Sequence, residues 1–81
     1  MRIMKTYRWP SPVGVFRIQY FASLGRWKLS INDEVLGTYL KDHQAADDVS
    51  SQATGYDKWD MFDMTKAMMI APADLGDWES K

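Results

Sequence analysis

Apolar and polar side chains alternate along residues 26–31, where the sequence reads RWKLSI. A two-residue period is typical of a strand with one buried face, because successive side chains of a strand point to opposite sides of the sheet. The turn-forming run Asn32-Asp33-Glu34 follows, and a second short strand is predicted from Val35 to Leu40. The buried positions of the first strand are Trp27, Leu29 and Ile31, and the outer positions are Arg26, Lys28 and Ser30.

The same alternation occurs earlier in the chain and predicts a strand from Val13 to Phe21. Residues 22–25 form a short connection, in which Gly25 is free to take a positive φ. Three consecutive strands joined by short links predict an antiparallel meander. In the earliest of these strands the apolar positions are Phe16, Ile18 and Tyr20, and the polar positions are Arg17 and Gln19.

The pairing of the second hairpin has two solutions. A two-residue loop at Asp33-Glu34 sets Trp27 opposite Leu40, whereas a three-residue loop brings Tyr39 onto the face of Trp27. We favour the first register because it keeps the polar side chains together, and a slip of one residue would move every side chain to the other face. In that register the outer face holds Arg26, Lys28, Ser30 and Tyr39.

After these strands the sequence predicts a helix from Asp42 to about Gln52. Asp42 is a favourable N-cap residue, and Gly55 suits the C-terminal stop. The apolar face of this helix is narrow and small, so the helix must lie close to the sheet. That face consists of Ala45, Ala46 and Val49.

Residues 56–64, which read YDKWDMFDM, are ambiguous between a helical turn and a short strand. We expect an irregular segment that lays Trp59 and Phe62 over the open side of the core. Farther on, Pro72 is suited to open one helical turn, with Leu75 and Trp78 on one side.

Together these elements predict an α+β fold, in which a three-stranded antiparallel meander packs on one α-helix and an irregular aromatic C-terminal segment closes the core. We expect one domain over residues 1–81, with a β-β-β-α core at 13–64 and a C-terminal extension at 65–81. Residues 1–12 are expected as an extended lead-in, because Pro10 and Pro12 disfavour a helix. With 81 residues, 46% of them hydrophobic and four of them tryptophan, the chain can build one small core.

The composition excludes several classes of site. The chain has no cysteine, which rules out disulfides, thiolate metal ligands and cysteine nucleophiles. The start of the chain has no apolar run of signal-peptide length, and no window approaches a membrane span. We therefore expect a soluble protein of the cytoplasm with no membrane partner.

Charge is distributed unevenly along the chain. Residues 1–32 carry six basic and no acidic side chains, whereas residues 33–81 carry eleven acidic and four basic ones, for a total of −1. One interpretation is that the two halves complement each other within the fold. The other is that a basic face is available to an anionic partner.

Side chains that perform catalysis or bind metals do not form a recognisable set. His43 is the single histidine and begins the predicted helix, so no second imidazole is available for a metal site. Asp57, Asp60 and Asp63 do not follow the ligand spacing of a calcium loop, and we interpret them as a solvated acidic surface. The sequence thus predicts no catalytic residue, no metal and no cofactor, and a protein that is not an enzyme.

Two surfaces are candidate binding sites. Basic side chains on the outer face of a sheet can hold phosphates and read base edges in a DNA groove. A methionine-rich stretch, if exposed, would suit a protein partner or self-association, because thioethers adapt to irregular surfaces. We expect a small accessory or protein-interaction module, with a weak nucleic-acid-binding domain as the alternative. The residues of the sheet candidate are Arg17, Arg26, Lys28 and Tyr39, and those of the apolar candidate are Met68, Met69 and Ile70.

The middle and the end of the chain carry a series of short motifs: Trp27-x-Leu29-x-Ile31, Leu36-Gly37-x-Tyr39, Ala45-Ala46-x-x-Val49, Thr54-Gly55, Trp59-Asp60 and Pro72-x-Asp74-Leu75-x-x-Trp78. Taken together, the motifs resemble a group of small bacterial proteins of unknown function. The resemblance covers most of the chain and implies a shared fold without a known activity.

Residues 27–46 are also similar to the three-stranded DNA-binding domain of plant ethylene-response factors and related integrase arms. There a strand like Leu36-Gly37-Thr38-Tyr39 runs into an alanine-rich helix behind a DNA-reading sheet. This resemblance implies DNA contact through Arg17, Arg26 and Lys28, which correspond by face only. The hairpin tip differs, because it carries the acidic pair Asp33-Glu34.

Overall fold

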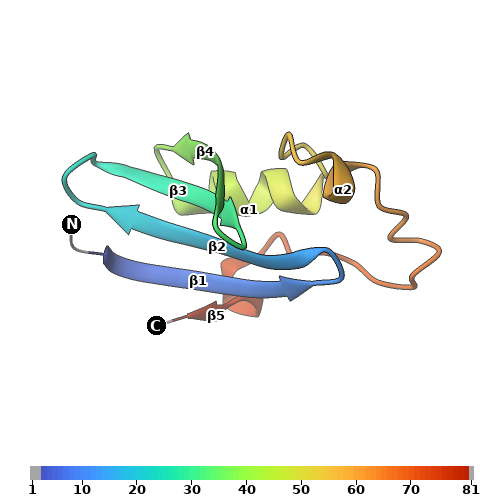
Figure 1. Ribbon diagram of the computed structural model, residues 1–81. Coiled ribbons are helices and arrows are strands. Elements are labelled where there is room, and N and C mark those ends of the chain that lie inside the picture. The colour runs from blue at the N-terminus through green and yellow to red at the C-terminus, as the bar shows by residue number, and fades with distance from the viewer. Residues whose placement is uncertain (1–2, 81) are drawn as a thin grey trace.

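The computed structural model describes residues 3–80 as one antiparallel sheet with an α-helix packed on one face (Figure 1). The sheet has five strands in the order β4-β3-β2-β1-β5. The predicted α+β class, with an antiparallel meander packed on one helix, is confirmed. The strands are β1 (Ile3–Ser11), β2 (Gly14–Phe21), β3 (Arg26–Ile31), β4 (Glu34–Tyr39) and β5 (Glu79–Ser80), and the helical segments are α1 (Asp42–Ser50), α2 (Asp57–Asp60) and the 3-10 turn η1 (Leu75–Asp77).

The prediction of a three-stranded sheet is wrong, because it missed β1 and β5. The segment expected as an extended lead-in is the nine-residue strand β1, which pairs with β2 along most of its length. Pro10 lies inside β1, opposite Val15. Proline has no N–H for a ladder and is tolerated near the edge of a sheet. Pro10 has such a position, because β5 pairs only with Tyr7 and Arg8 of β1 and leaves the rest of that strand as an edge.

The favoured register of the β3–β4 hairpin is also wrong. Trp27 lies opposite Tyr39 rather than Leu40, and the pairing shifts by one residue nearer the turn. The shift is a β-bulge beside Gly37, a residue type that often marks an irregularity inside a strand. Tyr39 consequently shares the face of Trp27, which is the face that packs on the helix.

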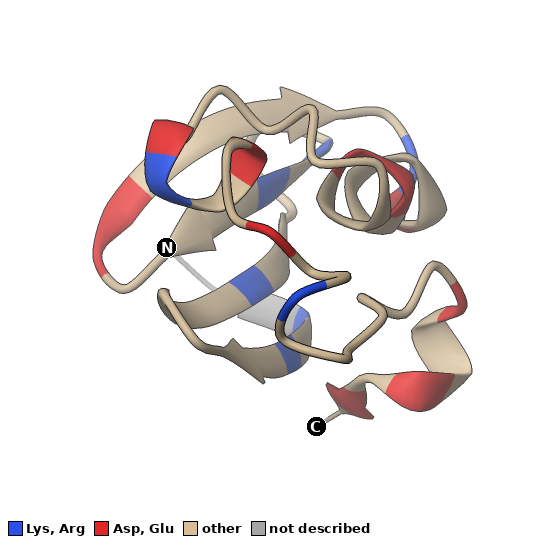
Figure 2. Cartoon of the chain, turned by 90° about the vertical axis from the view of Figure 1, so that its right-hand side faces the viewer, with Lys and Arg blue, Asp and Glu red and all other residues tan. Residues whose placement is uncertain are grey.

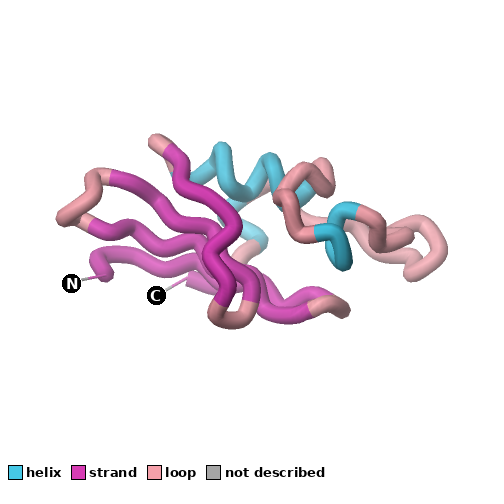
Figure 3. Tube along the Cα trace, turned by 45° about the horizontal axis from the view of Figure 1, so that its top comes forward, coloured by secondary structure: helices cyan, strands magenta, loops and turns pink. Residues whose placement is uncertain are grey.

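Helix α1 lies on one side of the sheet (Figure 3) and covers the face that carries the buried apolar side chains. Its predicted apolar side is confirmed and fully buried; it consists of Ala45, Ala46 and Val49. The N-cap is Lys41 rather than Asp42, and the Lys41 N–H donates to Oε1 of Gln44 at 3.1 Å. The helix ends at Ser50, well before Gly55, because Gln52 takes a positive φ of 56° that a helix cannot continue.

Trp59 lies at the centre of the core and has no exposed surface. Its ring centroid is 5.4 Å from that of Phe16, 5.5 Å from that of Trp9 and 5.8 Å from that of Phe62. Its indole N–H donates to the carbonyl of Val49 in α1 at 2.8 Å. The one-turn helix α2 presents this side chain, so the ambiguous segment contains a single helical turn followed by irregular backbone.

The C-terminal segment returns to the sheet. The expected helical turn before Trp78 is present as η1, and it begins after Asp74, whose side chain accepts from the N–H of Gly76 at 2.8 Å. Trp78 is 4% exposed, and its indole N–H donates to the carbonyl of Pro72 at 2.9 Å. The aromatic C-terminal segment therefore closes the core, and β5 extends the sheet beyond β1.

Candidate nucleic-acid interface

The outer face of the sheet lies opposite α1, and none of the helical segments within residues 3–80 packs on it. α1 contacts β2, β3 and β4 on the inner face. Trp59 of α2 and Trp78 after η1 both pack against Trp9, which also stacks near Phe16 of that inner face. Because side chains of a strand alternate, the residues between these buried ones point to the open side.

Basic side chains gather on this open side across three strands, and we call this surface the basic face. Figure 2 shows most lysine and arginine positions on the strands and most acidic positions on the helical segments and loops. The two charged halves of the sequence are thus partly separated in space. The cross-strand pairs of the basic face are Arg8 with Arg17, Arg17 with Ser30, Gln19 with Lys28, and Phe21 with Arg26.

Much of the positive charge on the basic face has no ion-pair partner within the described part of the chain. Arg8 forms one, with 2.9 Å between its Nη1 and Oε1 of Glu79. Arg17 instead donates from Nη1 to the backbone carbonyl of Asn32 at 3.3 Å. Arg8 and Arg17 are direct cross-strand neighbours, and like charges in that position destabilise a sheet. An anion bound beside both guanidinium groups would offset that repulsion.

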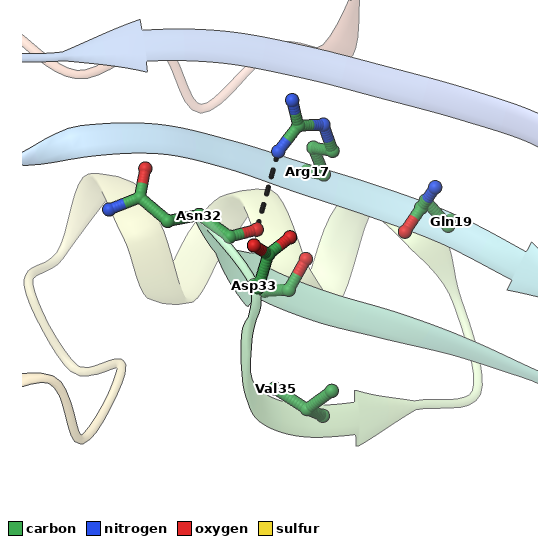
Figure 4. A pocket seen from close by; sticks show the side chains of 6 residues that line it. Arg17, Gln19, Asn32, Asp33 and Val35 are labelled. Carbon is green, nitrogen blue, oxygen red and sulfur yellow. Dashed lines mark hydrogen bonds between the residues drawn. The ribbon is translucent and has the colours of Figure 1, made fainter.

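Two shallow hollows flank Arg17 on the basic face, each with a volume of about 320 Å³. Figure 4 shows the first, where the Arg17 guanidinium lies close to the β3–β4 turn and Gln19 follows along β2. Hydrogen-bond donors suited to phosphate line both hollows, and each hollow is also lined by one acid, Asp33 in the first and Glu79 in the second. The first is lined by Arg17, Gln19, Ser30, Asn32, Asp33 and Val35, and the second by Thr6, Arg8, Arg17, Glu79 and Ser80.

Tyr39 does not belong to the basic face, so the sequence-based placement of this residue is wrong. Its hydroxyl donates to Oδ2 of Asp48 in α1 at 2.8 Å. Burial, together with the Asp48 carboxylate, raises the pKa of Tyr39 well above its usual range, and the hydroxyl therefore remains a donor. Tyr7 donates to Oδ2 of Asp42 at 3.1 Å in the same manner. Both tyrosines tie the inner face of the sheet to the helix.

The structure brings Arg17, Arg26 and Lys28 together on the basic face and adds two residues that sequence reasoning missed. Arg8 was missed because residues 1–12 are predicted as an extended lead-in, although Arg8 lies between the apolar residues Tyr7 and Trp9. Phe21 was missed because it is apolar and lies outside the apolar period of β2, which is Phe16, Ile18 and Tyr20. Its place two residues after Gln19 put it on the outer face.

The second predicted surface lies on the loop at residues 61–70, which projects from one end of the molecule (Figure 1). Met68 is 92% exposed and Ile70 is 88% exposed. Met69, between them, is half-buried and packs against the core, so the structure separates it from the other two. Met61 on the same loop is also exposed, at 82%.

Within residues 3–80, no group of three or more histidine, aspartate or glutamate side chains is arranged to hold a metal ion. His43 is exposed in the first turn of α1. Asp60 is not simply a solvated acid, because it accepts hydrogen bonds from Thr54 and Gly55. No helix in this part of the chain is long and apolar enough to cross a membrane.

Comparison with protein-family models, curated proteins and solved structures finds no match to the chain. The two sequence resemblances therefore stay predictions.

Proposed function

We propose that this protein is a non-enzymatic binding module that holds the phosphate backbone of a nucleic acid on its basic face. The observation that carries the proposal is that Arg17, Arg26 and Lys28 share one open face without an ion-pair partner in the described residues. A phosphate backbone that replaces the counterions of such side chains gains affinity without reading sequence. The basic face thus favours nucleic-acid binding, which was the alternative function expected from the sequence.

The strength of this binding is limited by the number of charges. Arg8 is already paired with Glu79, and the acidic hairpin tip at Asp33 and Glu34 bounds one end of the face. Three unpaired cations supply only the sequence-independent contribution, for which dissociation constants of about 10⁻⁴–10⁻⁶ M are typical at physiological salt. The net charge of −1 adds no long-range attraction, so the contact must be local.

The affinity of this protein for a single-stranded oligonucleotide should decrease as the salt concentration rises. With three phosphate contacts, the affinity should fall about 20-fold between roughly 50 and 200 mM salt, since each contact adds about 0.7 to the logarithmic slope. Arg17→Ala should reduce that fall to about 7-fold and weaken binding at low salt. Fluorescence anisotropy titrations at the two salt concentrations measure both quantities.

The matched control for Arg17→Ala is Lys58→Ala, which removes one positive charge from the exposed surface of α2 rather than from the basic face. It should leave the salt slope unchanged. Equal slopes for wild type and Arg17→Ala, or equal losses in the two variants, would rule out the basic face as the phosphate-binding surface.

A second candidate function is protein contact through the apolar loop tip, and the exposure of Met68 and Ile70 favours it. Exposing apolar side chains on a projecting loop to water costs free energy. That free energy is recovered when a partner covers the side chains. Met68 also takes a positive φ of 56°, a conformation that costs free energy for a residue with a side chain. We propose a second copy of the chain as the first partner to test.

If this loop mediates self-association, the double variant Met68→Ser, Ile70→Ser should weaken it by at least about 10-fold, because each apolar side chain buried in a contact contributes about 1.5–3 kcal/mol. Sedimentation velocity over a range of concentrations measures the change. Leu24→Ser, which alters an exposed side chain in the β2–β3 connection, is the control. A wild-type protein that remains monomeric at every concentration would exclude self-association.

A further inference from the structure

Phe21 occupies an unusual place for an aromatic residue in so small a protein. It lies at the end of β2 on the basic face, opposite Arg26 of β3. It belongs neither to the buried core nor to the partly buried side chains that pack against that core. In contrast to its neighbour Tyr20, whose ring lies 5.1 Å from that of Trp27, Phe21 pairs with no other aromatic ring within the described residues.

Two basic residues lie next to Phe21, and one of them contacts its ring. The Nζ of Lys28 lies 4.5 Å from the centroid of Phe21, in the position of a cation–π contact. Arg26 is the direct cross-strand neighbour of Phe21 and is exposed. An aromatic ring flanked by basic side chains on an open sheet is the combination by which single-stranded nucleic acids are bound: a base stacks on the ring and phosphates meet the cations.

We propose that the basic face binds single-stranded nucleic acid in preference to duplex, with an unpaired base stacked on Phe21 and the adjoining phosphates held by Arg26 and Lys28. This inference rests on the proposed function and names the form of nucleic acid that the face accepts. The long, flexible stem of Lys28 lets its ammonium group move from the ring to a phosphate when the base arrives.

Duplex is disfavoured for two reasons that the structure supplies. The faces of paired bases are stacked within a duplex and are not available to Phe21. In addition, the hairpin tip with Asp33 and Glu34 bounds the face, and a rigid duplex laid along the sheet would bring phosphates toward these carboxylates. A flexible single strand can contact Arg26 and Lys28 and then bend away from the acidic tip.

The experiment compares three labelled probes by fluorescence anisotropy at about 50 mM salt, where electrostatic contacts are strongest. The probes are a thymidine strand of about 12 nucleotides, the corresponding duplex, and a strand of the same length that lacks bases. The length of about 12 nucleotides is within the range that single-strand-binding modules cover. The proteins are wild type, Phe21→Leu, Phe21→Trp and Arg17→Ala. Leucine keeps apolar bulk at the site and removes the ring, and tryptophan enlarges the stacking surface.

Wild type should bind the thymidine strand about 10-fold more tightly than the duplex, because stacking on one aromatic ring contributes roughly that factor or more. Phe21→Leu should lose about 10-fold in affinity for the thymidine strand, with no change for the duplex or the base-free strand. Phe21→Trp should bind the thymidine strand at least as tightly as wild type does. Arg17→Ala should weaken the binding of all three probes.

Each contrary result has a distinct meaning. If Phe21→Leu weakens all probes equally, or weakens none, stacking on Phe21 is overturned while the phosphate-binding face stands. If wild type binds duplex and single strand equally, the preference is overturned. If wild type binds no probe at low salt, the proposed function itself fails. Amide NMR spectra of each variant establish that the sheet is intact, so that a lost affinity is not a folding defect.

Discussion

Replacing Trp59 with alanine is expected to lower the free energy of unfolding by about 3–5 kcal/mol, the range for large aromatic side chains removed from a core. Trp59 has no exposed surface and packs between the rings of Trp9, Phe16 and Phe62. Alanine would leave a cavity where the inner face of the sheet, α1 and the segment that follows α2 meet. A domain of this length has a total stability of only about 4–12 kcal/mol, so the substitution should remove at least about a quarter of it.

Urea denaturation followed by circular dichroism measures the loss of unfolding free energy in Trp59→Ala. Two further variants separate the contribution of the ring from that of the indole hydrogen bond and of position in the core. Trp59→Phe keeps a ring in the core but removes the indole N–H that donates to the carbonyl of Val49, so its loss should be about 1–3 kcal/mol. Trp27→Ala removes a half-buried tryptophan of the sheet and should cost less than Trp59→Ala. A loss below about 1.5 kcal/mol for Trp59→Ala would contradict the central place given to this ring.

The second large effect is expected at Asp60. Its carboxylate accepts the Thr54 N–H at 3.0 Å, the Thr54 hydroxyl at 2.7 Å and the Gly55 N–H at 2.8 Å. These bonds fix the loop between α1 and α2, and therefore the direction from which Trp59 enters the core. Asp60→Ala leaves the N–H and the hydroxyl proton of buried Thr54 without an acceptor and should cost about 2–3 kcal/mol of stability, because hydrogen bonds to a charged acceptor are among the strong ones.

Asp57→Ala is the matched control for Asp60→Ala, because it removes an exposed carboxylate from the same short helix and should change stability by less than about 0.5 kcal/mol. Asp60→Asn retains one acceptor oxygen for Thr54 and should lie between the two. Both are compared with wild type by urea denaturation. If Asp60→Ala and Asp57→Ala were equally mild, the three hydrogen bonds would not be important for the loop.

The most predictable elements were those that depend only on residues close together in the sequence. β2, β3 and α1 follow from the local period of apolar residues, and the buried side of α1 was identified correctly. β1 was missed, although Tyr7 and Trp9 alternate with polar neighbours, because Pro10 is also compatible with a lead-in. β5 has two residues, which is too short for any period to be visible.

The candidate interface was predicted in part, and the missing residues have a common cause. Arg17, Arg26 and Lys28 share a face because alternation within β2 and β3 is local. Arg8 joins them only through the pairing of β1 with β2. Tyr39 is not part of the basic face because a bulge beside Gly37 shifts the register of β4 by one residue. The separation of Met69 from Met68 and Ile70 likewise depends on which side of an irregular loop meets the core.

The sequence by itself determined the α+β class, the helix with its small apolar side, the absence of cysteine chemistry and the uneven distribution of charge. These depend on residue types and on periods of two or about 3.6 residues, which are properties of short segments. The tertiary structure alone decided the number of strands, the hairpin register and the membership of the basic face. Those depend on hydrogen bonds between segments distant in sequence, where a shift of one residue exchanges the two faces of a strand.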